Sequence, residues 1–372
     1  MTNRERILAI LNYNNYDRMP VVHFGYWKET LLKWSEEGYI AKEIAENCSD
    51  GNEWDQQLNK ILGWDLCWGY GYGVFNDLKP PFECKILKEF SDGSFHVLKS
   101  DGTIVLEKPG IVSISSEIDH TLKDRSSWEE CYLPRLQFNS KAIFETLKLA
   151  KKVPEPAVRD QPFSIVCGSL FGILRNWLGL EGISYLSMDN EELFDEMIDT
   201  IGNLAYENIK AILEGGYKPD YAHYWEDICF KGGPLVTPSV FDSKVGPYYK
   251  RISELLKENS VFLTSLDCDG LIDTLIPTWV NNGVNVMFPI EVGTWNASIR
   301  PWRKEYGKTI RGVGGMDKKV FAYDRKTVDM EIERLKPLVD LGGYIPCPDH
   351  RIPPDAKWDN VKYYCEKIRE NF

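Results

Sequence analysis

The sequence predicts an α/β fold, a (β/α)₈ barrel that forms one domain over residues 1–372. A small antiparallel β insertion is expected at about residues 80–112. Three observations predict this fold. Runs of β-branched or aromatic residues alternate with amphipathic helices, eight such runs can be counted, and no G-x-G-x-x-G follows the first of them. Apolar strands joined by helices indicate a parallel sheet covered on both faces. A doubly wound sheet is the structural alternative.

The predicted strands follow one another along the whole chain. They are MPVVHFG (19–25), the less regular WDLCWGYGYG (64–73), FSIVCG (163–168), YAHYWED (221–227), VFLTSLD (261–267), VNVMFPIE (284–291), TIRGVGG (309–315) and GYIPCPDH (343–350). The clearest helices are 189–213 and 325–342, and the second ends in Gly-Gly as a helix terminus does. Residues 84–108 carry two Ser-Asp-Gly turns between alternating runs, a pattern typical of an antiparallel hairpin.

Composition excludes several classes of function. The formal net charge of −12 argues against binding to nucleic acid or to an anionic membrane surface, since either needs a basic patch. No apolar run approaches the ~20 residues of a membrane span, and the N-terminus has no apolar signal-peptide core. The nine cysteines are an odd number without a C-x-x-C pair. Reduced thiols in a cytoplasmic protein fit this better than a disulfide framework.

Acidic residues gather where the predicted strands end, which is where barrels of this type build their active sites. Crowded carboxylates repel one another unless a cation or shared protons intervene. A metal ion is therefore expected, with nitrogen from His350 and oxygens from carboxylates. Any one of these residues can instead cap a helix, as Asp269 before Gly270 illustrates. The acidic strand-end residues are Asp65, Glu226, Asp227, Asp267, Asp269, Glu291, Asp317 and Asp349.

Other residues near the predicted rim could contact a substrate. His23 lies in or just after the first strand, where pocket lining and core packing are equally reasonable. The aromatic residues Trp27, Tyr70, Trp225 and Trp295 could clamp an aromatic substrate, although ordinary packing is the simpler interpretation of each one.

The chain resembles the uroporphyrinogen decarboxylase superfamily nearly from end to end. The resemblance rests on NRERILAILNYNNYDRMPV, EDICFKGGPLVTPSVFDSKVGPYYKRI, DCDGLIDTLIPTWVNNGVNVMFPIEV, GVGGMDK and GGYIPCPDHRIPPDAKWDNVKYY. It implies a TIM barrel, in agreement with the strand count, and a homodimer is an expectation from the resemblance alone. True uroporphyrinogen decarboxylases carry an arginine-containing loop after the first strand, but here that loop reads HFGYWKE (23–29). His350, and more loosely Asp65, are similar in position to the decarboxylase's site residues.

The corrinoid-linked methyltransferases of the same superfamily hold zinc with a His-x-Cys pair and a late cysteine. Asp267, Asp269 and His350 match those three positions, so the spacing is kept while the thiolates are replaced by harder ligands. Such a site suits Lewis-acid polarisation of an ether or hydroxyl oxygen. Cys268 and Cys347 are less suitable ligands, because strand alternation turns their side chains away.

The resemblance thus implies a metal-dependent methyltransferase. It would move a methyl group between a small methylated compound, with a methoxylated aromatic as one candidate, and the cobalt of a separate corrinoid protein. The expected cofactors are a divalent metal such as zinc, held by Asp267, Asp269, Glu291 and His350, and a partner-borne corrinoid (cobalamin). Glu226, Asp227 and Asp65 are the catalytic candidates. A decarboxylase of a small or tetrapyrrole acid, and a non-catalytic corrinoid-binding barrel, are the alternatives.

Overall fold

A parallel sheet that closes on itself forms the centre of the fold. The computed structural model describes residues 1–75, 78–108 and 115–372. Seven strands pair in the order β15-β14-β13-β12-β9-β8-β3, and β1 pairs with β2. The barrel strands are β1 (Val22–His23), β2 (Leu66–Cys67), β3 (Gly71–Gly73), β8 (Ser164–Gly168), β9 (Tyr221–Trp225), β12 (Thr264–Asp267), β13 (Val286–Phe288), β14 (Arg311–Met316) and β15 (Tyr344–Pro348).

Two connections close the sheet into a barrel. The segment Leu66–Gly73 contributes both β2 and β3, so that one end of it pairs with β1 and the other with β8. On the other side of β1, Trp27 N–H donates to the Ile352 carbonyl at 3.2 Å and Ile352 N–H donates to the Gly25 carbonyl at 3.0 Å. All the pairs within the barrel are parallel. The described strands therefore occupy eight positions, and the predicted barrel is confirmed.

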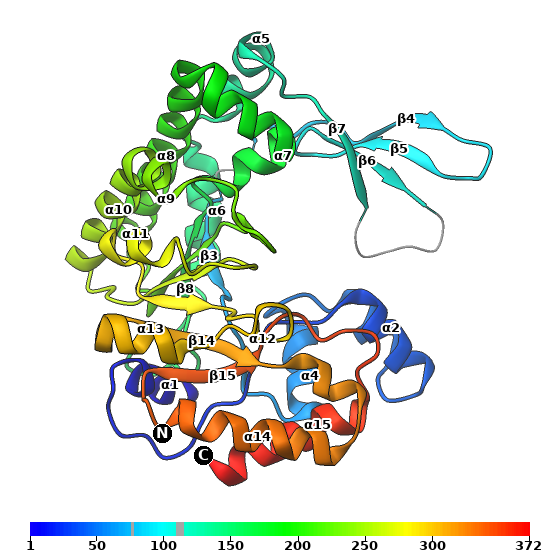
Figure 1. Ribbon diagram of the computed structural model, residues 1–372, viewed down its shortest axis with the longest axis vertical. Coiled ribbons are helices and arrows are strands. Elements are labelled where there is room, and N and C mark those ends of the chain that lie inside the picture. The colour runs from blue at the N-terminus through cyan, green and yellow to red at the C-terminus, as the bar shows by residue number, and fades with distance from the viewer. Residues whose placement is uncertain (76–77, 109–114) are drawn as a thin grey trace.

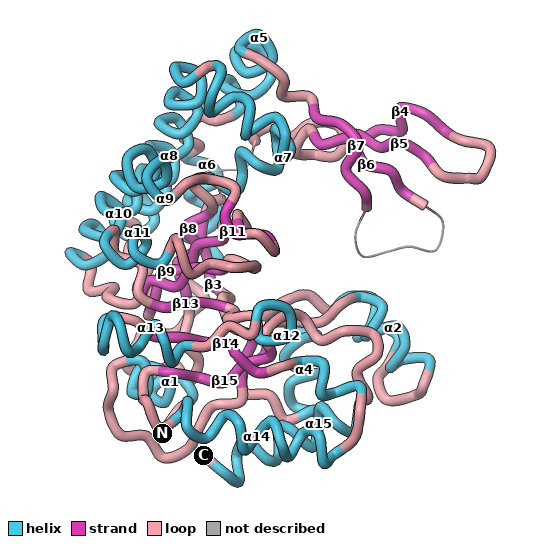
Figure 2. The backbone as a smooth tube through the Cα atoms, in the orientation of Figure 1, coloured by secondary structure: helices cyan, strands magenta, loops and turns pink. Residues whose placement is uncertain are grey.

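Helices cover the outside of this sheet (Figures 1 and 2). The longer ones are α1 (Asn3–Leu11), α2 (Lys28–Glu36), α3 (Lys42–Asn47), α4 (Glu53–Leu62), α6 (Ser140–Ala150), α7 (Gly172–Asp189), α8 (Glu191–Glu214), α10 (Gly246–Glu258), α11 (Ile276–Asn281), α13 (Ile299–Tyr306), α14 (Arg325–Val339) and α15 (Trp358–Asn371). Shorter elements are α5 (Arg125–Ser127), α9 (Pro238–Val240), α12 (Val292–Trp295), β10 (Cys229–Phe230) and β11 (Gly233–Pro234).

The predicted helices have local reasons for their ends. In α8 the side chain of Asn190 accepts a hydrogen bond from Leu193 N–H, so the helix begins at Glu191. In α14 the side chain of Asp324 accepts from Thr327 N–H. After α14, Gly342 and Gly343 have φ of +66° and +59°, a backbone conformation that favours glycine. No helix in the described ranges is both long and apolar enough to cross a membrane.

The insertion forms a separate antiparallel sheet that stands away from the barrel (Figure 1). Its strands are β4 (Lys85–Glu89), β5 (Phe95–Leu98), β6 (Thr103–Glu107) and β7 (Ser116–His120), paired in that order. The segment 84–108, for which the sequence predicted two turns between alternating runs, contains β4, β5 and β6. The sheet continues to His120, because β7 adds a fourth strand whose side chains are almost all exposed and so lack an apolar pattern. Residues 109–114, the end of the predicted insertion, lie outside the described residues.

Candidate active site

The carboxyl ends of β9, β12, β13 and β15 bring together most of the predicted site residues. Strands β9 and β12 are neighbours, with Trp225 opposite Asp267, and β13 follows with Phe288 opposite Asp267. Asp227, Asp269 and Glu291 extend past these ends, and His350 extends past β15. Because the strands are parallel, these side chains meet at one mouth of the barrel, as predicted for this fold.

Alternation along β12 decides which of its side chains face the barrel interior. Ser265 faces inward, where its Oγ accepts a hydrogen bond from Trp68 Nε1–H at 3.2 Å. Asp267 and Asp269 are two and four residues further on, and thus share this side. Cys268 faces the other way, since Ile228 N–H donates to its Sγ at 3.4 Å in a buried contact. The expectation that Cys268 turns away from the mouth agrees with this placement.

Asp269 lies at the centre of the acidic group. Its Oδ2 is 3.2 Å from His350 Nε2, while its Oδ1 is buried without a hydrogen-bond partner among the described residues. The imidazole of His350 stacks on Trp27, with ring centroids 5.5 Å apart and planes at 25°. Phe24 meets His350 edge-on, also at 5.5 Å. The aromatic contacts hold His350 over the carboxylate, leaving one oxygen of Asp269 unused.

Burial, with nearby like charge, raises the pKa of the carboxyl groups around Asp269. Asp267 is only 8% exposed, and its burial, with Asp269 and Asp227 nearby, raises its pKa well above the usual range. Burial also raises the pKa of Asp227, against the opposing charge of Arg175. Burial and then Asp269 raise the pKa of Glu291, although bonds from Trp295 and Gly270 oppose this. Desolvation and like charge act together here, the condition under which a cation is favoured.

The cations near the mouth already pair with carboxylates other than Asp267, Asp269 and Glu291. Arg175 pairs with Asp227 at 3.0 Å, and Arg351 donates to Asp50 at 2.9 Å. Lys318 lies 3.5 Å from Asp349. Among the described residues no lysine or arginine forms an ion pair with Asp267, Asp269 or Glu291. These three carboxylates, with the His350 nitrogen and the unpartnered Asp269 oxygen, offer the hard ligands that a divalent cation prefers.

Among the residues described, the four predicted metal ligands do not form a compact group. The group whose ligand atoms all lie within 4.8 Å of one another is His23, Asp55 and Cys67, which are all buried. Asp269 and His350 are in direct contact. The residues at the mouth therefore fit a divalent cation by their chemistry, and side-chain rotations are required to assemble them around it.

The compact His23 group has a different explanation, which corrects the prediction that His23 lines a substrate pocket. His23 is fully buried and faces Asp55 on α4, away from the mouth. Gly25 N–H donates to its Nδ1 at 2.9 Å, so the single proton of a neutral imidazole must lie on Nε2, 3.6 Å from Asp55 Oδ1. Burial lowers the pKa of His23 and raises that of Cys67. A protonated Nε2 and a neutral thiol are poor metal ligands.

Glu226 was predicted to be catalytic, and the structure places it in a helix cap instead. It is completely buried on the outer side of β9. Backbone N–H groups of Leu170, Phe171 and Gly172 donate to its carboxylate at 2.9, 3.0 and 2.6 Å, at the start of α7. The hydroxyls of Ser169 and Tyr249 also donate to it. The prediction failed because alternation turns Glu226 away from the interior that Trp225 and Asp227 face.

Asp65 and Tyr70 also lie outside the mouth. Asp65 precedes β2, at the amino end of the barrel, and pairs with Arg18 at 2.7 Å and Arg369 at 3.1 Å. Its prediction as a strand-end acid is wrong, because the strand begins after it rather than before it. Tyr70 lines a cavity of about 470 Å³ between α4 and the start of β8. Its ring lies 5.9 Å from that of Phe163 there.

The three predicted tryptophans differ in their contacts. Trp27 stacks on His350, as described above. Trp225 follows Tyr224 at the end of β9, with the Arg175 guanidinium 5.8 Å from its ring. Trp295 Nε1–H donates to Glu291 Oε2 at 2.5 Å. Each of the three thus contacts an acidic or basic side chain of the mouth. All three are only partly buried, so part of each ring stays exposed.

Sequence reasoning missed two residues that face this interior. Arg175 reaches the mouth from α7, a helix whose position over the strand ends no local pattern reveals. His223 lies in the middle of β9 and is partly exposed between buried neighbours. The alternation of YAHYWED could have found it, since residues 221, 223, 225 and 227 share one side of the strand.

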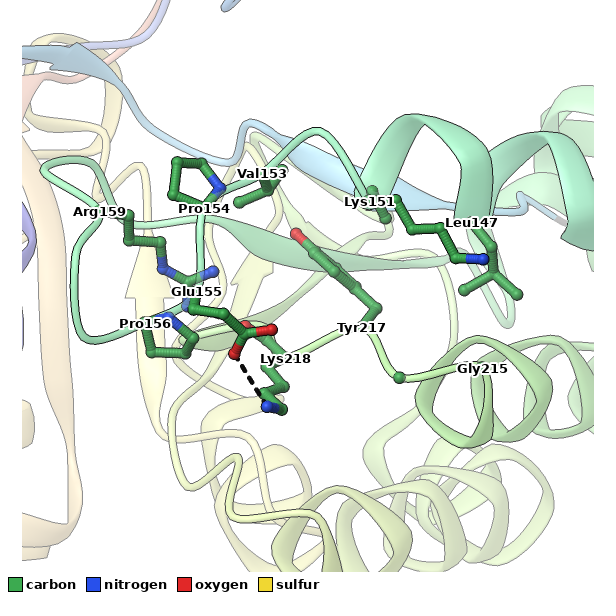
Figure 3. A pocket seen from close by; sticks show the side chains of 12 residues that line it. Leu147, Lys151, Val153, Pro154, Glu155, Pro156, Arg159, Gly215, Tyr217 and Lys218 are labelled. Atoms are coloured by element: carbon green, nitrogen blue, oxygen red, sulfur yellow. Dashed lines mark hydrogen bonds and ion pairs between the residues drawn. The ribbon is translucent and has the colours of Figure 1, made fainter.

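Surface cavities occur elsewhere on the molecule as well. A cavity of about 130 Å³ is lined by several residues between 147 and 159 and by residues 215–218. Glu155 and Lys218, which form an ion pair of 2.8 Å, lie at its edge (Figure 3). These segments precede β8 and β9, so the cavity lies toward the amino ends of the strands. It contains none of the predicted site residues.

Comparison with solved structures finds proteins of similar fold. The chain resembles a methyltransferase from Methanosarcina mazei over 100% of its own length and 99% of that chain, with a TM-score of 0.63 and 16% sequence identity. Weaker likenesses are to a B12-independent methionine synthase from Shewanella sp. W3-18-1 (TM-score 0.49, 12% identity, 95% and 98% of the two chains covered) and to a putative one from Listeria monocytogenes (0.42, 13%, 96% and 99%). No protein-family description and no curated protein match the chain. The likeness supports the barrel expected from the superfamily resemblance.

Proposed function

We propose that this protein is a metal-dependent methyltransferase that moves a methyl group between a small methylated compound and the cobalt of a separate corrinoid protein. The observation that carries the proposal is the acidic mouth, where Asp267, Asp269 and Glu291 lack a cation partner among the described residues and Asp269 contacts His350. The full-length likeness in fold to a methyltransferase from Methanosarcina mazei supports it as well.

Asp267, Asp269, Glu291 and His350 would hold the metal, for which zinc is the first candidate. A divalent cation bound there supplies Lewis acidity for an ether or hydroxyl oxygen. The partly exposed rings of Trp27, Trp225 and Trp295 bind and orient the donor beside the carboxylates. The ion pair of Arg175 with Asp227 fixes the position of that carboxyl group at the edge of the site.

Asp227 is the proton donor in this proposal. Burial raises the pKa of Asp227 against the opposing charge of Arg175, which is the direction that suits a general acid. In demethylation of an ether the bond between the methyl carbon and oxygen breaks, and its electron pair stays on the oxygen. A reduced corrinoid on a partner protein would supply the electron pair of the new bond to the methyl carbon, and Asp227 would give its proton to the departing oxygen.

The corrinoid belongs on a partner protein in this scheme. No D-x-H-x-x-G stretch, the kind of motif that binds the corrinoid, occurs in the sequence. The protein would thus act with a corrinoid protein and a small methyl donor, in the reduced environment that its unpaired cysteines suit.

Metal content and methyl transfer test the proposal together. The protein is loaded with zinc, freed of excess metal and analysed by elemental mass spectrometry, as wild type and as Asp269→Ala with His350→Ala. We expect near-stoichiometric metal in the wild type and its loss in the double variant, with loss of methylation of a reduced corrinoid protein. Cys268→Ala is the matched control, because Cys268 lies between two predicted ligands and faces away from them.

Three results would contradict the proposal. A folded wild type that takes up neither zinc nor manganese would remove the metal from the mouth. Equal metal content in the wild type and the double variant would place it elsewhere, with the buried His23, Asp55 and Cys67 group as the place to look. Release of carbon dioxide from a carboxylated substrate, unaffected by a chelator, would instead indicate a decarboxylase.

A further inference from the structure

A polar side chain lies deep in the barrel, below the acidic mouth. His223 faces Ser265 of β12, one layer beneath the pair formed by Trp225 and Asp267. Two residues along a strand correspond to about 7 Å, so His223 lies about that far below the carboxylates. It is nevertheless partly exposed, whereas Tyr221 beneath it is buried. Part of the His223 side chain is therefore left uncovered by the surrounding residues.

The walls around His223 are aromatic and offer it few partners. Its ring lies 5.9 Å from that of Phe288 and 6.5 Å from that of Tyr221, both nearly edge-on. Its Nδ1 is buried without a hydrogen-bond partner in the described part of the chain. Gly69, with φ of +85°, makes room for it, because a Cβ there would lie 2.7 Å from His223 Nε2. A polar group kept unpaired against aromatic walls is costly to the free protein unless a ligand uses it.

His223 is neutral in the working range of a cytoplasmic enzyme. Burial lowers its pKa to about 4. A neutral imidazole has one N–H donor and one acceptor nitrogen, so it can pair with a hydroxyl or carbonyl group. The neutral imidazole adds no positive charge to the barrel interior. Arg175, Arg351 and Lys318 at the mouth already pair with carboxylates. A carboxylate on the inner end of a ligand would thus meet no unpaired cation among these residues.

We propose that His223 is a specificity-determining residue that binds a second oxygen substituent of the methyl donor, at the end remote from the methylated oxygen. The inference rests on the proposed function and narrows its substrate class. The donor is a neutral planar ring that carries one methoxy group and one hydroxyl or carbonyl group. Phe24, Trp68 and Phe288 form the apolar walls for such a ring, with Phe24 and Phe288 in edge contact at 4.5 Å.

The test compares three probes by calorimetry with zinc-loaded protein and no corrinoid protein. The probes are 4-methoxyphenol, methoxybenzene and 4-methoxybenzoate. We expect the wild type to bind 4-methoxyphenol about tenfold more tightly than methoxybenzene, the scale of one well-formed hydrogen bond, and 4-methoxybenzoate most weakly. His223→Phe keeps a ring of similar shape and should bring the first two affinities to within about twofold. His96→Phe, on the separate β4–β7 sheet, is the control and should keep the wild-type ratio.

A second readout guards against a folding artefact. Removal of an unpaired buried polar atom should leave the thermal midpoint of the ligand-free His223→Phe protein equal to or above that of the wild type. Equal ratios of the two affinities in the wild type and His223→Phe would overturn the inference, as would preferred binding of 4-methoxybenzoate or binding of none of the probes. None of these outcomes bears on metal content or on corrinoid methylation, so the proposed function is tested independently.

Discussion

At the scale of the residue, the pKa of His223 illustrates how the barrel interior differs from water. His223 has an ordinary pKa near 6.5, and burial lowers it to about 4. Between these values the unfolded chain binds a proton that the folded protein does not bind. The contribution of His223 to the free energy of unfolding is thus complete above about pH 6.5 and is lost as the pH falls toward 4.

The pH dependence of unfolding therefore gives a test of His223. From pH 7 to pH 5 the wild type should lose about 2 kcal/mol more of its free energy of unfolding than His223→Phe loses. The measurement is urea denaturation of the metal-free proteins at both pH values. The other titrating groups, including buried His23, are common to the two proteins and cancel in the comparison. The same pH dependence in both would mean that the imidazole is as well solvated as in the unfolded chain.

At the scale of the element, alternation along a strand decides which of the predicted residues face the mouth of the barrel. Asp267 and Asp269 were found because a carboxylate on either side of Cys268 is visible in the sequence. Glu226 and Asp227 are adjacent, and the sequence does not show which of them faces inward. The answer depends on the register of β9 against β8 and β12 and on the N–H groups of Leu170, Phe171 and Gly172, which come from another part of the chain.

Substitution of Glu226 distinguishes its observed helix-capping role from a catalytic one. Glu226→Gln replaces one of the two carboxylate oxygens, both of which accept from backbone N–H groups at the buried start of α7, with an NH₂ group that cannot accept. We expect the free energy of unfolding to fall by about 3 kcal/mol. Asp227→Asn, one residue further and facing the mouth, should change it by less than about 1 kcal/mol. Chemical denaturation of both variants measures this difference. An unchanged midpoint for Glu226→Gln, with activity lost, would instead restore the catalytic role.

At the scale of the whole molecule, the regular features of the sequence predicted the regular features of the fold. Seven of the eight barrel positions coincide with clear apolar runs. The less regular run at 64–73 became two short strands separated by Trp68, Gly69 and Tyr70. Contacts between distant segments were not predictable. Helices α2 and α3 lie between His23 and Asp55 in the sequence, and Arg351 pairs with Asp50 across 301 positions. Such pairs depend on how the barrel closes, which no local pattern specifies.

Closure of the barrel also explains the position of Asp65 and its ion pairs. Asp65 connects three distant parts of the chain, because Arg18 lies before β1, Arg369 lies on α15, and Val21 N–H donates to the same carboxylate at 2.8 Å. Nearby, Met19 N–H donates to the carbonyl of Phe372 at 2.8 Å, so both ends of the chain meet at this end of the barrel. Burial by itself would raise the pKa of Asp65, but bonds from Arg18 and Val21 and the charge of Arg369 outweigh it and lower that pKa.

Asp65→Asn should therefore lower the free energy of unfolding by about 3 kcal/mol at pH 7, since it leaves two arginines without their shared partner. Metal content and the binding of 4-methoxyphenol should not change, because the carboxylate lies at the opposite end of the barrel from His350. A lowered pKa stabilises the folded state above the unfolded value of about 4, so the difference from the wild type should shrink as the pH falls below that value. Denaturation midpoints at pH 7 and pH 3.5, with metal analysis of the same samples, test both statements. Loss of metal with an unchanged midpoint would return Asp65 to the active site.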